Sequence, residues 1–446
     1  MAANRKIRIL IVDDSAVMRS LLRRVIMSDA GLEVAGTAGD GETALGVLQS
    51  LHPDLVLLDV EMPVMDGLVT LRKLRAGGHK MPVIMCSSLT QRGATVTIEA
   101  LACGASDYVA KPAGQASREA AVEALSQDLI PRIRALFVRQ QPQTVLSAPR
   151  SPLCPPLAPV SATQAISSIP TALAIAVSTG GPAALDILLP ALPSGFPLPV
   201  LVVQHMPELF TKLFAERLNG RCRLAAHEGV EGEPVRPGTI YIARGNWHME
   251  VLAAAHIGSP VTLRLAQGPL ENHCRPAADV LFRSMAAVYG PGVLAVVLTG
   301  MGSDGMLGCR NVRERGGCVL AQDQASSTVW GMPGAVAQAG LAHKVLPLDA
   351  IAPEIVRMAG RAAAAPTQLP NNLPRGLTGE IDQDLAQNQN SRTQGKSSQG
   401  GFSFRPKDSD LSLGAPGLRK NPLKGRAAGY SNSGSAVARD LDRLVV

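Results

Sequence analysis

The chain has 446 residues and a formal net charge of +7; 46% of its residues are hydrophobic, 18% charged and only 3% aromatic. This length exceeds what one hydrophobic core usually organises, and the apolar content excludes a chain that is disordered throughout, so we expect two or more folded domains. Scarce aromatic side chains disfavour a surface that stacks nucleic-acid bases.

The cysteine spacing and the lengths of the apolar runs indicate where in the cell the protein is expected. The 7 Cys form no CxxC pair and no zinc-like spacing, which predicts reduced thiols. The apolar run at residues 7–12 is too short for a signal-peptide core, and no run predicts a membrane span. We therefore expect a cytoplasmic protein without membrane insertion.

Residues 5–125 alternate short, continuously apolar runs with amphipathic ones. This pattern is typical of parallel strands that are buried on both faces and covered by helices. The predicted strands are residues 7–12, 33–38, 55–58, 83–86 and 107–109. We predict a doubly wound α/β domain over residues 1–125, followed by a linker over 126–170 that becomes rich in Pro and Ser from residue 140.

The alternation restarts after the linker. The predicted strands are residues 172–177, 200–203, 239–243, 293–298 and 318–321, with helical runs between several of them. A second doubly wound, mostly parallel α/β domain is therefore expected over residues 171–360. Residues 361–446 hold 12 Lys and Arg against 7 Asp and Glu, and their polar composition predicts a disordered basic tail, a solvated appendage rather than an arm for lipid or nucleic acid.

Polar side chains follow the predicted strands of the first domain, where ligands bind in such sheets. Asp13 and Asp14 follow the first strand, Asp59 the third, Ser87 the fourth and Lys111 the fifth. Crowded carboxylates repel one another unless a cation neutralises them, and oxygen ligands suit Mg²⁺. A carboxylate beside Mg²⁺ can accept a phosphoryl group, and Asp59 is the best placed acceptor. Helix capping would explain either aspartate of the first pair alone, but not all five positions.

These positions resemble the receiver domains of response regulators, which have a flavodoxin-like fold. The resemblance spans about 120 residues and rests on ILIVDDS at 9–15, LDVEMP at 58–63, MDG at 65–67 and YVAKP at 108–112. It implies that a sensor histidine kinase phosphorylates Asp59 and that Mg²⁺ is held by Asp14, Asp59 and the Glu61 backbone carbonyl, with Asp13 acting through water. It also implies that Ser87 and Lys111 sense the phosphate and that Tyr108 reorients on activation. The bond between Lys111 and Pro112 matches a bond that is often cis in the family.

The first strand of the second domain ends at Ser178, in the sequence STGGP. Two Gly permit a sharp turn from strand to helix, which would present the Ser178 hydroxyl beside free N–H groups at a helix N-terminus. From these residues alone, a nucleophile and a phosphate-binding loop have similar weight, although the segment lacks the phosphate-loop Lys.

Two further strand ends favour the nucleophile. His205 follows the strand at 200–203, and Asp304 lies in the Gly-rich turn after the strand at 293–298. A serine hydroxyl needs a base to take its proton, and a carboxylate orients the histidine. Each residue alone could instead cap a helix or sit in a turn. His273 is the competing base, but it follows no clear strand, and we interpret it as a substrate contact at most.

The second domain also resembles a family, the chemotaxis protein-glutamate methylesterases, over about residues 171–355. The resemblance rests on STGG at 178–181, QHMP at 204–207, LTGMGSDG at 298–305 and GMP at 331–333. It implies a hydrolase-type domain with Ser178 as nucleophile, His205 as base, Asp304 as its orienting residue and the Met301 backbone N–H in the oxyanion hole. Ala277, where the family usually has Ser, and the tail are departures.

The resemblance implies an esterase activated by phosphorylation that hydrolyses glutamate γ-methyl esters on methyl-accepting chemoreceptors, releases methanol, and also deamidates receptor glutamine. The receiver would cover the esterase site until it is phosphorylated. The esterase step needs no cofactor, and we expect a monomer with no nucleic-acid partner. A phosphorylation-dependent docking module is the alternative, and a transcription factor is disfavoured because no helix-turn-helix pattern follows the linker.

Overall fold

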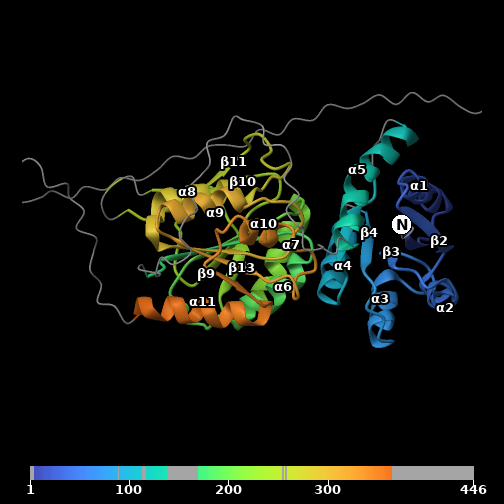
Figure 1. Cartoon of the computed structure of the whole chain (residues 1–446), viewed down its shortest axis with the longest axis horizontal. Helices are drawn as coiled ribbons and strands as arrows, with labels where there is room; N and C mark the ends of the chain where they lie inside the picture. The colour runs from blue at the N-terminus through green and yellow to red at the C-terminus, as the bar shows by residue number, and fades with distance from the viewer. Residues whose placement is uncertain are drawn as a thin grey trace, which may run out of the picture. The chain divides into compact units, whose positions relative to one another are not determined.

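The computed structural model (Figure 1) describes residues 5–88, 90–112, 117–137, 169–253, 256 and 259–363. All the described residues belong to one compact unit. The predicted tail from 364 and most of the predicted linker, 138–168, lie outside the described residues. Within the described part of the chain, no helix is long and apolar enough to cross a membrane.

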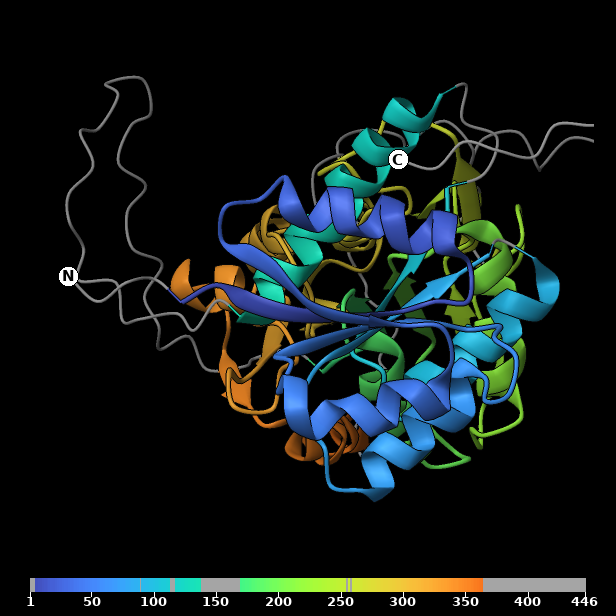
Figure 2. The ribbon, with the colours of Figure 1, turned by 90° about the vertical axis from the view of Figure 1, so that its right-hand side faces the viewer.

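The first domain is a parallel five-stranded sheet in the order β2-β1-β3-β4-β5. Its strands are β1 (Ile7–Val12), β2 (Leu32–Ala38), β3 (Leu55–Asp59), β4 (Val83–Ser87) and β5 (Asp107–Ala110). Its helices are α1 (Ala16–Met27), α2 (Gly41–Leu51), α3 (Gly67–Ala76), α4 (Gln91–Ala102) and α5 (Arg118–Phe137). Figure 2 shows α1 on one face of these strands and α2 and α3 on the other.

The second domain has a seven-stranded parallel sheet, ordered β14-β13-β12-β6-β7-β9-β8, and an antiparallel hairpin, β10-β11. The strands are β6 (Ala172–Val177), β7 (Val200–Gln204), β8 (Ala225–Glu228), β9 (Thr239–Ile242), β10 (His248–Leu252), β11 (Thr262–Ala266), β12 (Val293–Val297), β13 (Cys318–Gln322) and β14 (Lys344–Leu346). The helices are α6 (Gly181–Leu188), α7 (Glu208–Asn219), α8 (Ala278–Tyr289), α9 (Met306–Glu314), α10 (Met332–Gln338) and α11 (Leu348–Ala363), with short 3-10 turns at Leu189–Ala191 and Gly290–Gly292.

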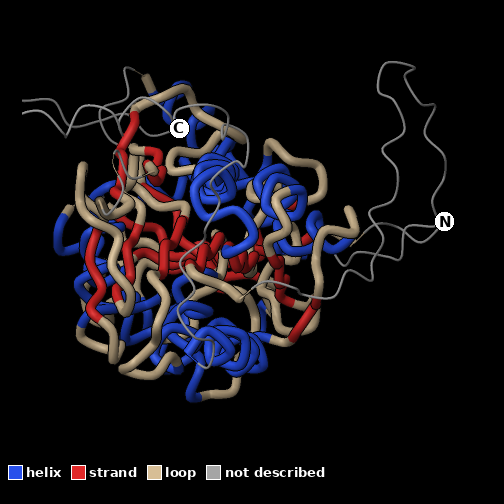
Figure 3. Tube along the Cα trace, turned by 90° about the vertical axis from the view of Figure 1, so that its left-hand side faces the viewer, coloured by secondary structure: helices blue, strands red, loops and turns tan. Residues whose placement is uncertain are grey.

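Alternating residues of each central strand bury opposite faces of the second sheet, as the two-residue period of a strand requires. Ala174 and Ala176 of β6 pack with α8, α9 and α10, whereas Leu173 and Ile175 pack with α6, α7 and α11. Figure 3 shows the strands lying between these two layers of helices. Because both faces are covered, the strands read as unbroken apolar runs, which is why they could be predicted.

The predicted fold class is confirmed: both domains are doubly wound α/β units with mostly parallel sheets. All ten predicted strands are present, shifted by at most one residue at an end. The strands β8, β10, β11 and β14 were not predicted. They are short and mix polar with apolar residues; β8 and β14 are the two edges of the large sheet, and β10 and β11 form the hairpin.

Two differences from the prediction concern boundaries and peptide geometry. Helix α5 continues to Phe137, twelve residues past the boundary expected at 125, because Leu125, Leu129 and Ile133 recur every four residues and bury one face. Among the described residues the cis peptide bond is Arg275–Pro276, so the bond between Lys111 and Pro112 is trans, whereas the matching bond is often cis in receiver domains.

Candidate functional site

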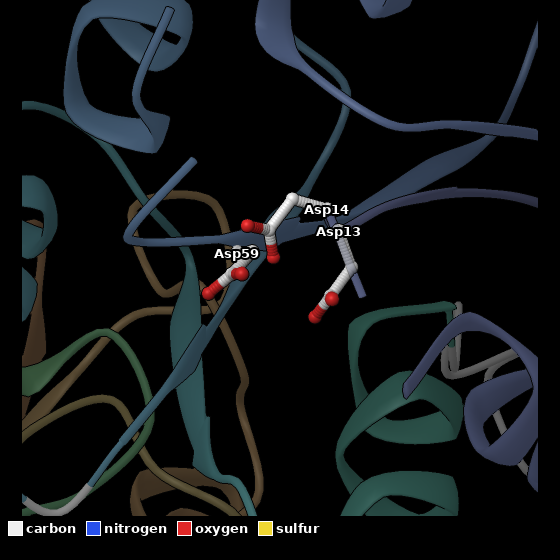
Figure 4. A group of neighbouring side chains, drawn as sticks. All are labelled: Asp13, Asp14 and Asp59. Carbon is white, nitrogen blue, oxygen red and sulfur yellow. The ribbon is translucent and has the colours of Figure 1, made fainter. Parts of the chain in front are cut away.

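Three strand-end aspartates form an acidic cluster in the first domain. One carboxylate oxygen from each of Asp13, Asp14 and Asp59 lies within 4.8 Å of the others. Figure 4 shows the Asp14 and Asp59 side chains close together, with Asp13 next to Asp14 along the chain. Asp13 and Asp59 are buried and Asp14 is exposed, so the cluster has one side open to solvent.

A lysine from the neighbouring strand end partly balances this charge. Lys111 Nζ lies 2.8 Å from Asp13 Oδ2 and 2.7 Å from Asp59 Oδ2. Burial raises the pKa of Asp59, and the nearby Asp13 carboxylate adds to the rise, against the hydrogen bond from Lys111. One cation facing three carboxylates leaves a net negative site, which favours a bound cation.

The remaining residues predicted for this site lie around the cluster. The Glu61 N–H donates a 3.4 Å hydrogen bond to Asp59 Oδ1, which places the Glu61 backbone beside the acceptor carboxylate. Ser87 ends β4, is fully buried, and its hydroxyl donates to the Ser88 carbonyl. Tyr108 is buried on β5 and is stacked on the Phe210 ring at a centroid distance of 4.7 Å.

The nucleophile candidate sits in a tight turn between β6 and α6. Gly180 has φ of 77°, in the left-handed region, and a Cβ there would lie 2.4 Å from Thr328 Oγ1, so only glycine fits. The Gly181 N–H donates to the Ser178 carbonyl, and the buried Gln204 side chain donates to the same carbonyl from β7. The Ser178 backbone is therefore held from two sides.

His205 and Asp304 are directly joined. The His205 Nε2 to Asp304 Oδ2 distance is 2.8 Å, and the two side chains come from turns after β7 and β12. Burial lowers the pKa of His205, but its hydrogen bonds with Asp304 and Cys274 outweigh this and raise it to about 9. Since Nε2 is engaged, Nδ1 is the nitrogen left for proton transfer; it lies 3.6 Å from the Cys274 sulfur.

Ser178 and His205 share the same sheet edge, because β6 and β7 are neighbours: the Gln204 side chain donates to the Ser178 carbonyl, and the His205 N–H donates to the carbonyl of Val177. Among the described residues, however, no hydrogen bond joins the Ser178 hydroxyl to His205. Catalytic hydrogen bonds are often long before substrate binds and tighten only in the complex. Two of the three predicted side chains are thus already in contact, and the third follows the neighbouring strand β6.

Backbone groups at the start of α8 support the Asp304 carboxylate. Oδ2 accepts from the Ala278 N–H at 2.7 Å, and Oδ1 from the Asp279 N–H at 3.1 Å and the Gly305 N–H at 3.0 Å. Ala277 has no side chain that could cap this helix, so Asp304 serves as its cap. The hydrogen bonds with His205 and these N–H groups lower the pKa of Asp304 although burial raises it.

The Gly-rich turn after β12 fixes a backbone donor near Ser178. The Gly300 N–H donates to Val329, the Gly300 carbonyl accepts from Gly331 and Met332, and a Cβ on Gly300 would meet Ser178 Cβ at 2.8 Å. The next N–H, that of Met301, has no acceptor within the described segments. An oxyanion hole requires a free backbone donor of this kind in a turn that packs against the nucleophile.

Residues of the first domain contact this turn. Asp107 Oδ2, paired with Arg132, accepts a 2.7 Å hydrogen bond from Thr179, the residue after Ser178. A pocket beside the turn is lined by Met301 and Trp330 and by Ala135 and Leu136 of α5. Thr179 and Met301 lie in motifs, but no pattern in the sequence pairs them with Asp107 or with α5, so sequence reasoning missed these contacts.

The two sheets, the acidic cluster and the Ser, His and Asp strand ends define a class: an α/β hydrolase-type domain joined to a response-regulator receiver. Comparisons agree. A family model described as "Response regulator receiver domain" matches residues 9–123, and one described as "CheB methylesterase" matches residues 173–355.

Whole-chain relatives narrow the class to one family. A "Protein-glutamate methylesterase/protein-glutamine glutaminase" of Nocardioides sp. is 49% identical over 83% of this chain and 98% of its own length. One of Trichodesmium erythraeum is 46% identical over 80% of this chain and 99% of its own. The Thermotoga maritima CheB methylesterase catalytic domain structure is 40% identical and covers 42% of this chain and 98% of its own, with a TM-score of 0.41. The chain belongs to the protein-glutamate methylesterase/protein-glutamine glutaminase family.

Proposed function

We propose that the chain is a phosphorylation-regulated serine esterase of chemotaxis, which hydrolyses glutamate γ-methyl esters on chemoreceptors and deamidates receptor glutamine. The observation that carries this proposal is the His205–Asp304 hydrogen bond at the sheet edge that also bears Ser178. A docking module would not need a buried imidazole paired to a carboxylate beside a hydroxyl.

In this mechanism, His205 Nδ1 takes the Ser178 proton as the hydroxyl oxygen attacks the ester carbonyl carbon. The oxyanion forms beside the Met301 N–H, and the imidazolium is stabilised by Asp304. Collapse breaks the bond to the methoxy group, which leaves as methanol with the proton from His205. Water then attacks the glutamyl-serine ester with His205 as base, which frees glutamate and restores Ser178. A glutamine substrate would pass through the same acyl-enzyme and release ammonia.

In the receiver, we propose that Asp59 accepts a phosphoryl group from a sensor histidine kinase. Donors that are all oxygen, one side open to solvent, and a net negative charge fit Mg²⁺; Asp14, Asp59 and the Glu61 carbonyl would hold it, with Asp13 acting through water. When bound, the ion neutralises charge on the transferred oxygens. Lys111 already reaches Asp59 and would pair with the phosphate, as would Ser87.

We further propose that the receiver restrains the esterase through the contacts of β5. Asp107 binds Thr179 beside the nucleophile, and Tyr108 stacks on Phe210 of α7. Phosphorylation that turns Tyr108 away would weaken this contact and shift the population of a two-state element. Tyr108→Ala is then expected to raise methanol release in the absence of a phosphodonor; no rise would contradict the restraint.

The test of the esterase assignment is methanol release from methylated receptor membranes. We expect release by the wild-type chain, loss of at least about 10³-fold in Ser178→Ala, and retention in Ser303→Ala, an exposed serine of the same region that serves as a matched control. Equal release by the wild type and Ser178→Ala would refute the enzyme and leave the docking module.

A further inference from the structure

A side chain outside the three predicted catalytic positions reaches the Asp304 carboxylate. Asn272 Nδ2 lies 2.9 Å from Asp304 Oδ1 and 2.9 Å from Asp279 Oδ2. A side-chain amide carries two N–H donors, so one Asn272 nitrogen can serve both carboxylates at once. No predicted strand end or motif contains this residue.

The two carboxylates that Asn272 joins are both almost fully buried, Asp304 at 2% exposed and Asp279 at 1%. Like charges this close oppose each other's ionisation. The Asp304 charge raises the pKa of Asp279, after the larger effect of burial, whereas the hydrogen bond from Asn272 lowers it. A neutral double donor between them lets Asp304 stay ionised and oriented without bringing in a further charge.

The backbone around Asn272 forms a tight turn that directs its side chain toward Asp304. Asn272 and His273 both have positive φ, 53° and 61°, a conformation that asparagine tolerates better than most residues. Glu271 and Cys274 exchange backbone hydrogen bonds and close the turn. The same turn therefore aims an amide at Asp304 and the Cys274 sulfur at His205.

We propose that Asn272 is a positioning residue for the esterase reaction: its amide fixes the Asp304 carboxylate that orients His205 and separates it from Asp279. Asn272 itself is an exposed residue that acts through Asp304 and does not contact the reacting atoms. This inference rests on the proposed esterase function and adds a fourth side chain to it.

Two substitutions remove the donor while preserving the backbone. Asn272→Gly accepts the positive φ and deletes the amide, and Asn272→Asp keeps the shape but replaces N–H groups by an acceptor. Asn246 offers a matched control, because it is also exposed, has φ of 64°, and bonds Arg275 rather than Asp304. Asn246→Gly and Asn246→Asp make the same chemical changes in the same domain.

We expect both Asn272 variants to lower kcat for methanol release about 10-fold or more, with KM close to wild type and, in Asn272→Gly, which adds no charge beside the two carboxylates, a thermal midpoint close to wild type. The Asn246 variants should keep kcat within about twofold. A purely structural turn role would lower the thermal midpoint or alter both pairs alike, and Asn272 variants with wild-type kcat would overturn the proposal.

A second readout keeps this test separate from that of the proposed function. In full-length protein with labelled histidine, the His205 ring proton shared with Asp304 should move in the NMR spectrum of the Asn272 variants and stay in place in the Asn246 variants. If the wild-type chain releases no methanol, the proposed esterase function is refuted, and this NMR measurement still decides the role of Asn272. An unmoved His205 resonance in the Asn272 variants would refute that role.

Discussion

Replacing Asp304 by asparagine should expose how much the carboxylate contributes to the reaction. His205 has a pKa of about 9, against an ordinary value of 6.5. Burial lowers this pKa, and the hydrogen bond with Asp304 is the largest of the interactions that raise it. One pKa unit corresponds to about 1.4 kcal/mol, so the rise represents about 3 kcal/mol in favour of the imidazolium. The same preference stabilises the imidazolium that forms when His205 accepts the Ser178 proton.

In Asp304→Asn the part of this stabilisation that Asp304 supplies is lost, so the pKa of His205 falls, with only the Cys274 interactions left to oppose burial. Since the neutral imidazole is the base, activity in the wild type should rise with pH through about 9. In the variant this limb moves to lower pH. The plateau kcat should fall by as much as about 10²-fold from the Asp304 part of the 3 kcal/mol, and by up to about 10⁴-fold if the imidazole also adopts the wrong tautomer.

The assay is methanol release as a function of pH, with circular dichroism as the control for folding, because Asp304 also caps α8. A variant within tenfold of the wild type, with an unmoved acid limb, would refute the argument that Asp304 sets the basicity of His205.

Three further predictions follow from other contacts. Gly180→Ala should abolish esterase activity and cost about 2 kcal/mol or more in stability by denaturant unfolding, because the left-handed φ and the Thr328 side chain leave no room for a methyl group; wild-type stability would contradict this. Iodoacetamide should alkylate the Cys274 thiol, and the added group should fill the space beside His205 Nδ1 and inactivate the wild type, whereas Cys274→Ala should be resistant. Equal inactivation of both would show that the reactive thiol lies elsewhere. Glu354→Gln should cost about 1 kcal/mol at pH 7, because hydrogen bonds from Arg357 and Lys344 lower the pKa of Glu354 to about 2. That contribution is present above the unfolded value of about 4.5 and is lost as the pH falls toward 2, so a difference that persisted at pH 2 would contradict the cause.

The sequence predicted the central strands and their polar ends well because both follow from local patterns. A parallel strand covered on both faces must be apolar along its length, and the residue after it must face the ligand edge. Asp13, Asp59, His205 and Asp304 could be located by this reasoning alone.

The parts that could not be predicted depend on contacts between distant segments. The hairpin β10-β11 alternates polar and apolar residues over five-residue strands, and such short runs are ambiguous. Asn272 lies in an irregular turn whose role depends on two carboxylates from other elements. The Asp107–Thr179 hydrogen bond joins residues 72 positions apart, and neither residue type signals it.

The nucleophilic role of Ser178 can be tested most directly by trapping the covalent intermediate. The chain would be mixed with a peptide that carries a glutamate γ-methyl ester, and the reaction would be quenched in acid within milliseconds. The protein would then be digested and its fragments analysed by mass spectrometry. The mechanism predicts a glutamyl adduct, formed with loss of methanol, on the fragment that contains Ser178, and none in Ser178→Ala. An adduct on Cys274, or methanol release by Ser178→Ala at the wild-type rate, would contradict it.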